Sequence, residues 1–153
     1  MPSYRICRSF VVESGHMLSR HPEACRFPHG HSRRIDVVVS ADNLDQNGMV
    51  LDFKALKLAL EDAIDKYDHS LAVNSADPLI EDLRRIAGER LVEFADTEPT
   101  TEVMAKEIFD FVADVLRNGW TSPDGMYAIP ASSTTLERVR VTETPNSWAE
   151  YGL

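Results

Sequence analysis

The sequence predicts a single α+β domain over residues 1–153, in which a four-stranded antiparallel sheet carries two long helices on one face. Two β-rich runs come first, two segments of helical periodicity lie in the middle, and two short extended runs follow. Elements segregated in this way usually pack as a layer of helices on an antiparallel sheet. A chain of 153 residues also lies within the size range of one domain.

The first two strands are predicted from runs rich in β-branched and aromatic residues. Residues 4–13 form the first run, and residues 31–41 form the second. Between them, residues 18–28 contain two prolines and mixed polarity, which predicts a loop. If this loop simply turns the chain back, the two strands pair antiparallel. Residues 42–48 are rich in turn-forming Asp, Asn and Gly, and they end the second strand.

The first long helix is predicted to open at residue 52 or 53 and to run to about residue 67. Its apolar positions recur at steps of three and four, as on one face of a helix. These positions are Leu56, Leu60, Ala63, Ile64 and Tyr67. We expect Phe53 and Leu56 to lie in the core.

The second long helix is predicted to start within Pro99-Thr100-Thr101-Glu102 and to reach about residue 116. Thr100 can cap the helix, and Glu102 puts negative charge in its first turn. The expected inner face includes Phe111 and four further apolar residues. These are Val103, Ile108, Val112 and Val115.

The remaining segments give weaker patterns. In residues 68–98 we expect a short helix at 79–87 and a short extended piece at 90–94, and residues 118–133 read as a loop. Alternation predicts a strand at 136–142, and a short last strand is expected at 148–152. A four-stranded sheet leaves its edges open, and such edges are often closed by pairing between subunits.

Three histidines near the start of the chain suit a catalytic zinc site. His29 and His31 flank a glycine at the start of a strand-like run, and residues two apart on a strand point to the same face. His16 can join them across a hairpin, although an ordinary loop histidine is the alternative. Three histidine ligands with an open fourth position are typical of catalytic Zn²⁺, whereas structural zinc is usually closed by four protein ligands. Cys25 is close enough in sequence to face the same cavity.

Composition excludes several classes of function. The formal net charge of −9 argues against a general binder of nucleic acid or of anionic membranes. The sequence has no apolar run of membrane-spanning length and no signal-peptide core after Met1, and its two cysteines suit free thiols in a reducing cytoplasm. Four arginines near the histidines form a local basic patch that could hold phosphate oxygens, or they could be solvated surface residues. They are Arg20, Arg26, Arg33 and Arg34.

Six motifs in order make the chain resemble the family of 6-pyruvoyl-tetrahydropterin and 6-carboxytetrahydropterin synthases over nearly its whole length. They are His16, Cys25-x-x-x-His29-Gly30-His31, Gly48-Met49-Val50-Leu51-Asp52-Phe53, Asp68-His69, Pro99-Thr100-Thr101-Glu102 and Glu143-Thr144. The resemblance implies the tunnelling fold (T-fold), assembly into trimers or hexamers with active sites between subunits, and zinc held by the three histidines.

The gap between the cysteine and His-Gly-His contains three residues, which resembles the carboxy branch of the family that serves queuosine and deazapurine synthesis. Three features depart from the family pattern. Arg33 stands where the family commonly has an aromatic residue, the segment from Asp68 to Asn74 is one residue longer than usual, and residues 75–97 are longer than in minimal members. These departures bear on the choice of substrate and leave the three histidines in place.

The resemblance also implies roles for individual residues. Cys25 would be the general base, with its thiol acidified by nearby cations, although an inert cysteine is the alternative. Asp68 and His69 would relay protons, unless they only cap a helix end.

For substrate binding, the resemblance implies that the Glu143 carboxylate accepts from the two-donor edge of a pterin. Thr101 and Glu102 are further candidate contacts with the substrate. Simple complementation of the helix dipole is the alternative for Glu102.

The predicted function is zinc-dependent conversion of the small molecule 7,8-dihydroneopterin triphosphate to 6-carboxy-5,6,7,8-tetrahydropterin, with loss of triphosphate and a two-carbon aldehyde. The close alternative is formation of 6-pyruvoyl-tetrahydropterin by the same residues. Two alternatives come from other classes: hydrolysis by a zinc-bound hydroxide, and pterin binding without catalysis.

Overall fold

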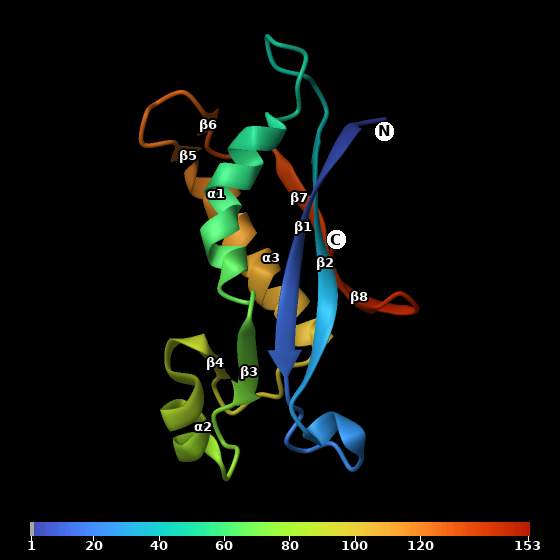
Figure 1. Ribbon diagram of the computed structural model, residues 1–153. Helices are drawn as coiled ribbons and strands as arrows, with labels where there is room; N and C mark the ends of the chain where they lie inside the picture. Colours follow the sequence, from blue (N-terminus) through green and yellow to red (C-terminus); the bar gives the residue numbers. More distant parts are fainter. Residues whose placement is uncertain (1) are drawn as a thin grey trace.

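The computed structural model describes residues 2–153, and its centre is a six-stranded sheet (Figure 1). The strand order is β4-β3-β1-β2-β7-β8. The strands of this sheet are β1 (Tyr4–His16), β2 (His29–Ala41), β3 (Ser70–Asn74), β4 (Leu91–Phe94), β7 (Thr135–Thr144) and β8 (Ser147–Gly152). A separate two-stranded sheet joins β5 (Trp120–Thr121) to β6 (Ala128–Ile129).

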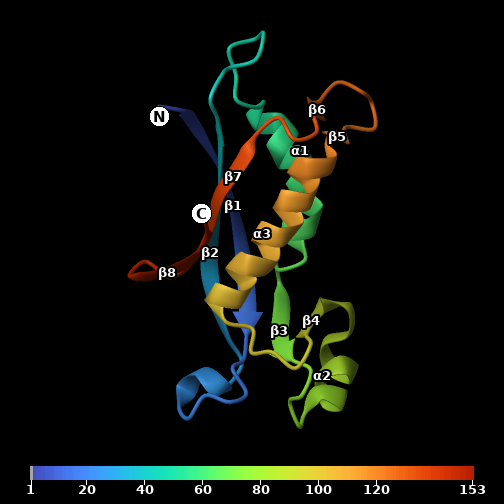
Figure 2. The ribbon, with the colours of Figure 1, turned by 180° about the vertical axis from the view of Figure 1, so that it is seen from behind.

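The two long helices, α1 (Phe53–Asp65) and α3 (Thr101–Asn118), lie side by side on one face of the sheet (Figures 1 and 2). Each helix buries a row of residues spaced four apart, which is the spacing that keeps side chains on one helix face. The rows are Leu56, Leu60 and Ile64 in α1, and Met104, Ile108, Val112 and Leu116 in α3. In the part of the chain that the structure describes, no helix has both the length and the apolar character needed to cross a membrane.

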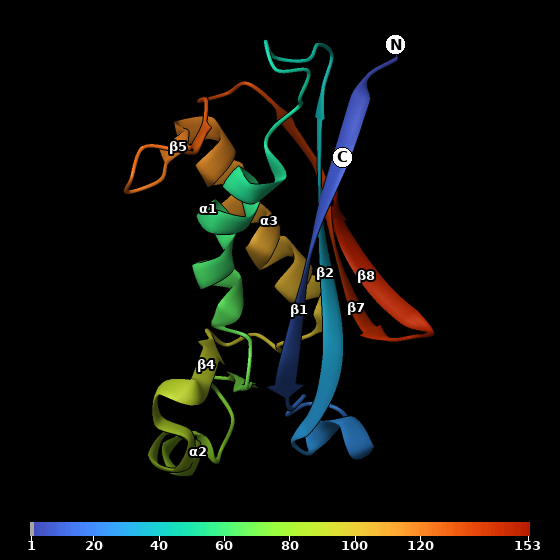
Figure 3. The same cartoon turned by 45° about the horizontal axis from the view of Figure 1, so that its top comes forward.

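The shorter helix α2 (Ile80–Ala87) lies with β4 near the end of the domain that carries the β1–β2 loop (Figure 3). Two short 3₁₀ turns occur in the loops, at Ala24–Arg26 and Gly88–Arg90. The predicted helix at 79–87 and the predicted extended piece at 90–94 are therefore confirmed within a residue or two.

The prediction of a four-stranded antiparallel sheet is wrong in part. The pairs β1–β2, β2–β7 and β7–β8 are antiparallel, as predicted. Two further strands extend the sheet, and both the β1–β3 and β3–β4 pairs are parallel. β3 was missed because it is short and buried at three consecutive residues, so it lacks the alternation of a half-exposed strand.

Two aromatic residues predicted to be core are also exposed. Phe53 is 50% exposed at the first position of α1, and Phe111 is 39% exposed at the border of the buried row of α3. Leu56 is fully buried, as predicted. The buried row of α3 runs at steps of four through Ile108 and Val112, which turns Phe111 toward the edge of the helix interface.

The cap of α3 can be tested because this helix end lies beside the histidines. The Thr100 hydroxyl accepts a hydrogen bond from the Val103 amide at 3.2 Å. We expect Thr100→Ala to lower the free energy of unfolding by about 1 kcal/mol, because that amide loses its acceptor. Urea denaturation measures the change. Thr100→Ser keeps the hydroxyl and should stay near wild type, and an equal loss in both variants would contradict the capping role.

Candidate metal centre and active site

The pairing of β1 with β2 brings the three histidines to one face of the sheet. His16 is paired directly with His29, and Ser14 is paired with His31. Residues paired across antiparallel strands project to the same side, and residues two apart along a strand do so as well. Both observed strands are longer at this end than the sequence predicted, since β1 reaches His16 and β2 begins at His29.

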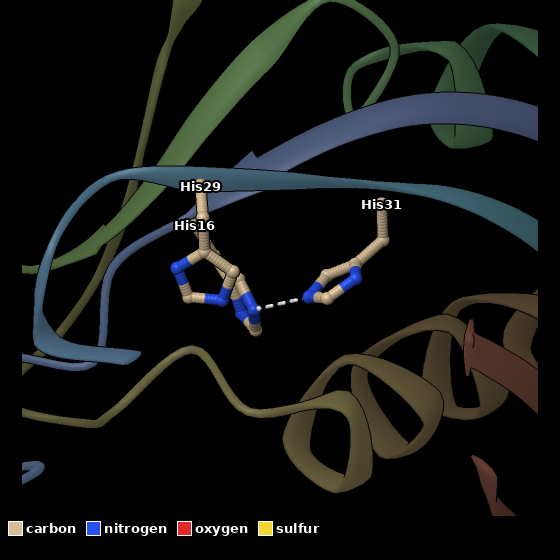
Figure 4. A group of neighbouring side chains, drawn as sticks. All are labelled: His16, His29 and His31. Atoms are coloured by element: carbon tan, nitrogen blue, oxygen red, sulfur yellow. Dashed lines mark hydrogen bonds between the residues drawn. The ribbon is translucent and has the colours of Figure 1, made fainter. Parts of the chain in front are cut away.

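The three imidazoles converge, as Figure 4 shows. One nitrogen of each lies within 4.8 Å of the corresponding nitrogens of the other two. The ring centroids are 4.6 Å apart for His16 and His29, and 5.1 Å apart for each of the other two pairs. The Nε2 atoms of His16 and His31 are 3.2 Å apart. Among residues 2–153, the three histidines are the group that meets this distance criterion.

Backbone carbonyls fix which nitrogen of two of the rings carries a hydrogen. His16 Nδ1 lies 2.8 Å from the Pro99 carbonyl oxygen, and His29 Nδ1 lies 2.7 Å from that of Phe27. A carbonyl oxygen can only accept, so each Nδ1 is the donor and each Nε2 of these neutral rings keeps its lone pair. Histidines that bind metals are commonly oriented by such a bond from their second nitrogen.

Two of the rings, His16 and His31, also have lowered pKa values, which favours their neutral form. His16 is fully buried, and this burial lowers its pKa to about 4. Burial lowers the pKa of His31 as well, and the Arg33 cation adds to that effect. A metal ligand must be deprotonated, so three convergent imidazoles, two of them with lowered pKa values, fit a Zn²⁺ ion.

Glu143 faces this cluster from β7. Its Oε1 atom lies 3.8 Å from the Nε2 atoms of both His16 and His31. The Thr101 hydroxyl at the start of α3 donates to the same oxygen at 3.0 Å. A hollow of about 640 Å³ opens beside Glu143 and is lined by His31 and Trp148, among others. The structure thus places two predicted substrate contacts, Glu143 and Thr101, beside the histidines.

Asp68 and His69 form a bonded pair. His69 Nδ1 lies 2.8 Å from Asp68 Oδ2, and the Asp68 pKa is lowered by a hydrogen bond from the Glu13 amide and by the bond from His69. His69 has φ 51°, a left-handed conformation that is uncommon for residues other than glycine, and its amide bonds to the Glu13 carbonyl. His69 and His31 both line one hollow of about 310 Å³.

Two other predicted residues lie outside the histidine group. Cys25 is half-buried in the 3₁₀ turn of the β1–β2 loop, and its carbonyl accepts from the Leu18 amide at 2.9 Å. Glu102 is exposed in the first turn of α3, where its charge complements the helix dipole.

The basic patch expected from the sequence is divided in the structure. Arg20 pairs with Asp96 at 3.0 Å, and Arg34 pairs with Asp36 at 2.9 Å. Arg33 is fully buried, so the prediction that it offers charge to phosphate oxygens at the surface is wrong. Its side chain instead reaches the hydroxyl of Thr101, a contact that no spacing in the sequence indicates.

Comparison with known proteins gives one consistent result. A family model described as 6-pyruvoyl tetrahydropterin synthase matches residues 5–152. A protein of Aquifex aeolicus named 6-carboxy-5,6,7,8-tetrahydropterin synthase is 28% identical, and the match covers 97% of each chain. A protein of Bacillus subtilis with the same name is 29% identical, over 97% of this chain and 85% of the relative.

Solved structures show the same fold. An uncharacterized protein from Wolinella succinogenes superposes with a TM-score of 0.76 at 21% identity, covering 99% of both chains. The 6-pyruvoyl tetrahydropterin synthase of Caenorhabditis elegans gives a TM-score of 0.63 at 22% identity, covering 100% of this chain and 97% of that one. These likenesses support the tunnelling fold that the motifs implied.

The metal centre can be tested by removing one imidazole at a time. We expect the wild-type chain to bind one Zn²⁺ ion, and His16→Ala, His29→Ala and His31→Ala each to lose stoichiometric zinc after dialysis, because two imidazoles make a weaker site than three. Elemental analysis measures the bound metal. His21→Ala, in the same loop but outside the group, is the matched control. Full zinc content in the three variants would rule out this centre.

Proposed function

The chain belongs to the 6-pyruvoyl tetrahydropterin synthase family, and from this membership we propose that it converts 7,8-dihydroneopterin triphosphate to 6-carboxy-5,6,7,8-tetrahydropterin with the help of a bound zinc ion. The observation that carries the proposal is the convergence of three imidazoles beside the Glu143 carboxylate. The names of the relatives from Aquifex aeolicus and Bacillus subtilis favour the carboxy product, as does the short gap between Cys25 and His29.

His16, His29 and His31 would hold the zinc ion. When bound there, zinc supplies a Lewis acid that stabilises negative charge developing on the oxygens of the substrate side chain. Three imidazoles account for three ligands of a four-coordinate ion, so one position would remain for those oxygens.

Proton transfer in this proposal is divided between two groups. Cys25 takes a proton from a side-chain carbon of the substrate, the role that the family resemblance implies for it. His69 returns or relays protons, and Asp68 holds its imidazole by the 2.8 Å bond to Nδ1. The bond sets the tautomer of His69, so Nε2 is the atom that exchanges protons with the substrate.

Glu143 holds the pterin ring in this proposal. Its carboxylate is anchored on one side by Thr101 and is 36% exposed, so it has lone pairs left for the amino and ring N–H donors of a pterin. The hollow beside it supplies space for the ring. Exposed arginines near the histidines, such as Arg26, would meet the triphosphate.

Assembly into a trimer or hexamer is part of the proposal. β4 and β8 are the outer strands of the sheet, and neither has a second neighbour within the part of the chain described. Sheet edges of this kind are commonly covered by pairing with another copy. The family relationship supports a homo-oligomer in which neighbouring subunits complete the active site.

The role of Cys25 gives a direct test. We expect Cys25→Ala to abolish turnover of 7,8-dihydroneopterin triphosphate while the zinc content stays at the wild-type level, because the base is removed and the ligands remain. Cys7→Ala, the matched control, should keep both. Mass spectrometry of the products distinguishes the carboxy product from the 6-pyruvoyl product. Unchanged turnover in Cys25→Ala would refute the proposed base and favour hydrolysis by a metal-bound hydroxide.

The role of Asp68 gives a second test. Asp68→Asn keeps an oxygen that can accept from the Glu13 amide but loses the charge beside His69. We expect kcat to fall by about 100-fold, the size of a typical contribution from general acid–base catalysis. Asp62→Asn on the exposed side of α1 is the control. A loss confined to KM, with kcat intact, would show that Asp68 does not serve proton transfer.

A further inference from the structure

Arg33 is among the largest side chains that are completely buried in residues 2–153, and its Nη2 atom lies 3.4 Å from Nδ1 of His16. Its Nη1 atom donates to the Thr101 hydroxyl at 2.8 Å and to the Thr142 carbonyl at 3.3 Å. Its Nε atom is buried without a hydrogen-bond partner. Burying a guanidinium is energetically costly unless it is fully paired, so stability alone does not account for an incompletely paired buried arginine.

The contacts of Arg33 fix the direction of a chain of hydrogen bonds. A guanidinium has donors and no acceptor, so the Thr101 oxygen must accept from Arg33. The Thr101 hydrogen then remains for Glu143 Oε1, which lies 3.0 Å away. Thr101 is 4% exposed, so solvent cannot easily replace either partner. The hydrogen bonds therefore run in one direction, from Arg33 through Thr101 to Glu143.

A second contact shows that Arg33 does not act by bonding to His16. Arg33 Nη2 lies 3.4 Å from His16 Nδ1, but that nitrogen already donates to the Pro99 carbonyl at 2.8 Å. Two donors cannot share a hydrogen bond, so the shorter contact with the carbonyl holds. The positive charge of Arg33 therefore acts on the histidines by opposing the binding of a cation. A nearby carboxylate is needed to offset this charge.

We propose that Arg33 and Thr101 are positioning residues that hold the Glu143 carboxylate against the three histidines, where it offsets the charge of Arg33 and strengthens cation binding. Thr101 acts through Glu143, because its hydroxyl already accepts a hydrogen bond from Arg33 and donates one to Glu143. The proposal rests on the metal centre of the proposed function, and it does not depend on which pterin product is formed.

The test is a titration of the metal-free protein with Co²⁺, followed by the visible absorption of the bound ion. Thr101→Val has nearly the same shape but no hydroxyl, so Glu143 is released while Arg33 keeps its charge. We expect the affinity for Co²⁺ to fall about tenfold, the lower end of the usual cost of losing a group that supports metal ligands. Thr101→Ser restores the hydroxyl and should bind like wild type, with an unchanged spectrum.

A double-mutant cycle shows whether the effect passes through Glu143. Glu143→Gln should lower the affinity at least as much as Thr101→Val, and adding Thr101→Val to Glu143→Gln should cause no further loss. If Thr101→Val does not fold, as judged by circular dichroism, Arg33→Met serves in its place. In wild type, Arg33→Met removes both the repulsion of the cation and the support of Glu143. In the Glu143→Gln background it removes only the repulsion, so it should favour Co²⁺ binding more there.

Three results would overturn the proposal. These are wild-type affinity in Thr101→Val, additive losses in the Thr101→Val and Glu143→Gln double variant, and equal effects of Arg33→Met in both backgrounds. Each of these results would leave the three-histidine centre standing. A wild-type chain that binds no Co²⁺ would instead overturn the metal centre and this proposal together.

Discussion

The antiparallel register of β1 and β2 is the constraint on which the candidate site depends. His16 and His29 meet because they are paired in this register, and a slip by one residue would turn His29 and His31 to the opposite face of the sheet. The apolar residues farther along the strands hold the register, since Ile35, Val37 and Val39 are all fully buried beneath the helices. The same row of side chains on β2 thus forms the core in the middle of the strand and part of the candidate metal centre at its start.

The N-terminus of α3 supplies the second half of the site. The Pro99 carbonyl orients His16, Thr100 caps the helix, and Thr101 bonds to Glu143. Three consecutive residues therefore connect the helix to β1 and to β7 at the same place. Because the buried face of α3 fixes the helix on the sheet, the core packing also sets the position of these contacts.

The sequence is informative where the feature depends on the spacing of residues within a single strand or helix. The separation of His29 and His31 by one residue predicted a shared face, and the four-residue steps predicted the buried rows of α1 and α3, because both follow from the geometry of a single element. The buried place of Arg33 could not be predicted, since it depends on Thr101 and Thr142, which are distant in the chain. The two backbone carbonyls that orient His16 and His29 could not be predicted either. Every residue has a backbone carbonyl, so the sequence does not indicate which ones accept from a histidine.

Residues 68–98, the segment with the weakest sequence pattern, join the candidate catalytic groups to one another. Asp68 and His69 bond to the backbone of Glu13, and β3 then pairs in parallel with the end of β1.

Beyond β3, the acidic residues Asp77 and Glu98 accept hydrogen bonds from Ser19 and Arg20 at the start of the loop that carries Cys25. The Met17 amide bonds to the carbonyl of Ala72 in β3, which ties the same loop to the sheet. β3, the strand that the sequence pattern did not predict, thus connects the Asp68–His69 pair, the loop that carries Cys25 and the strand that carries His16. A segment that serves mainly to connect others is specified by contacts between distant residues, and such contacts leave little periodic signal in the sequence.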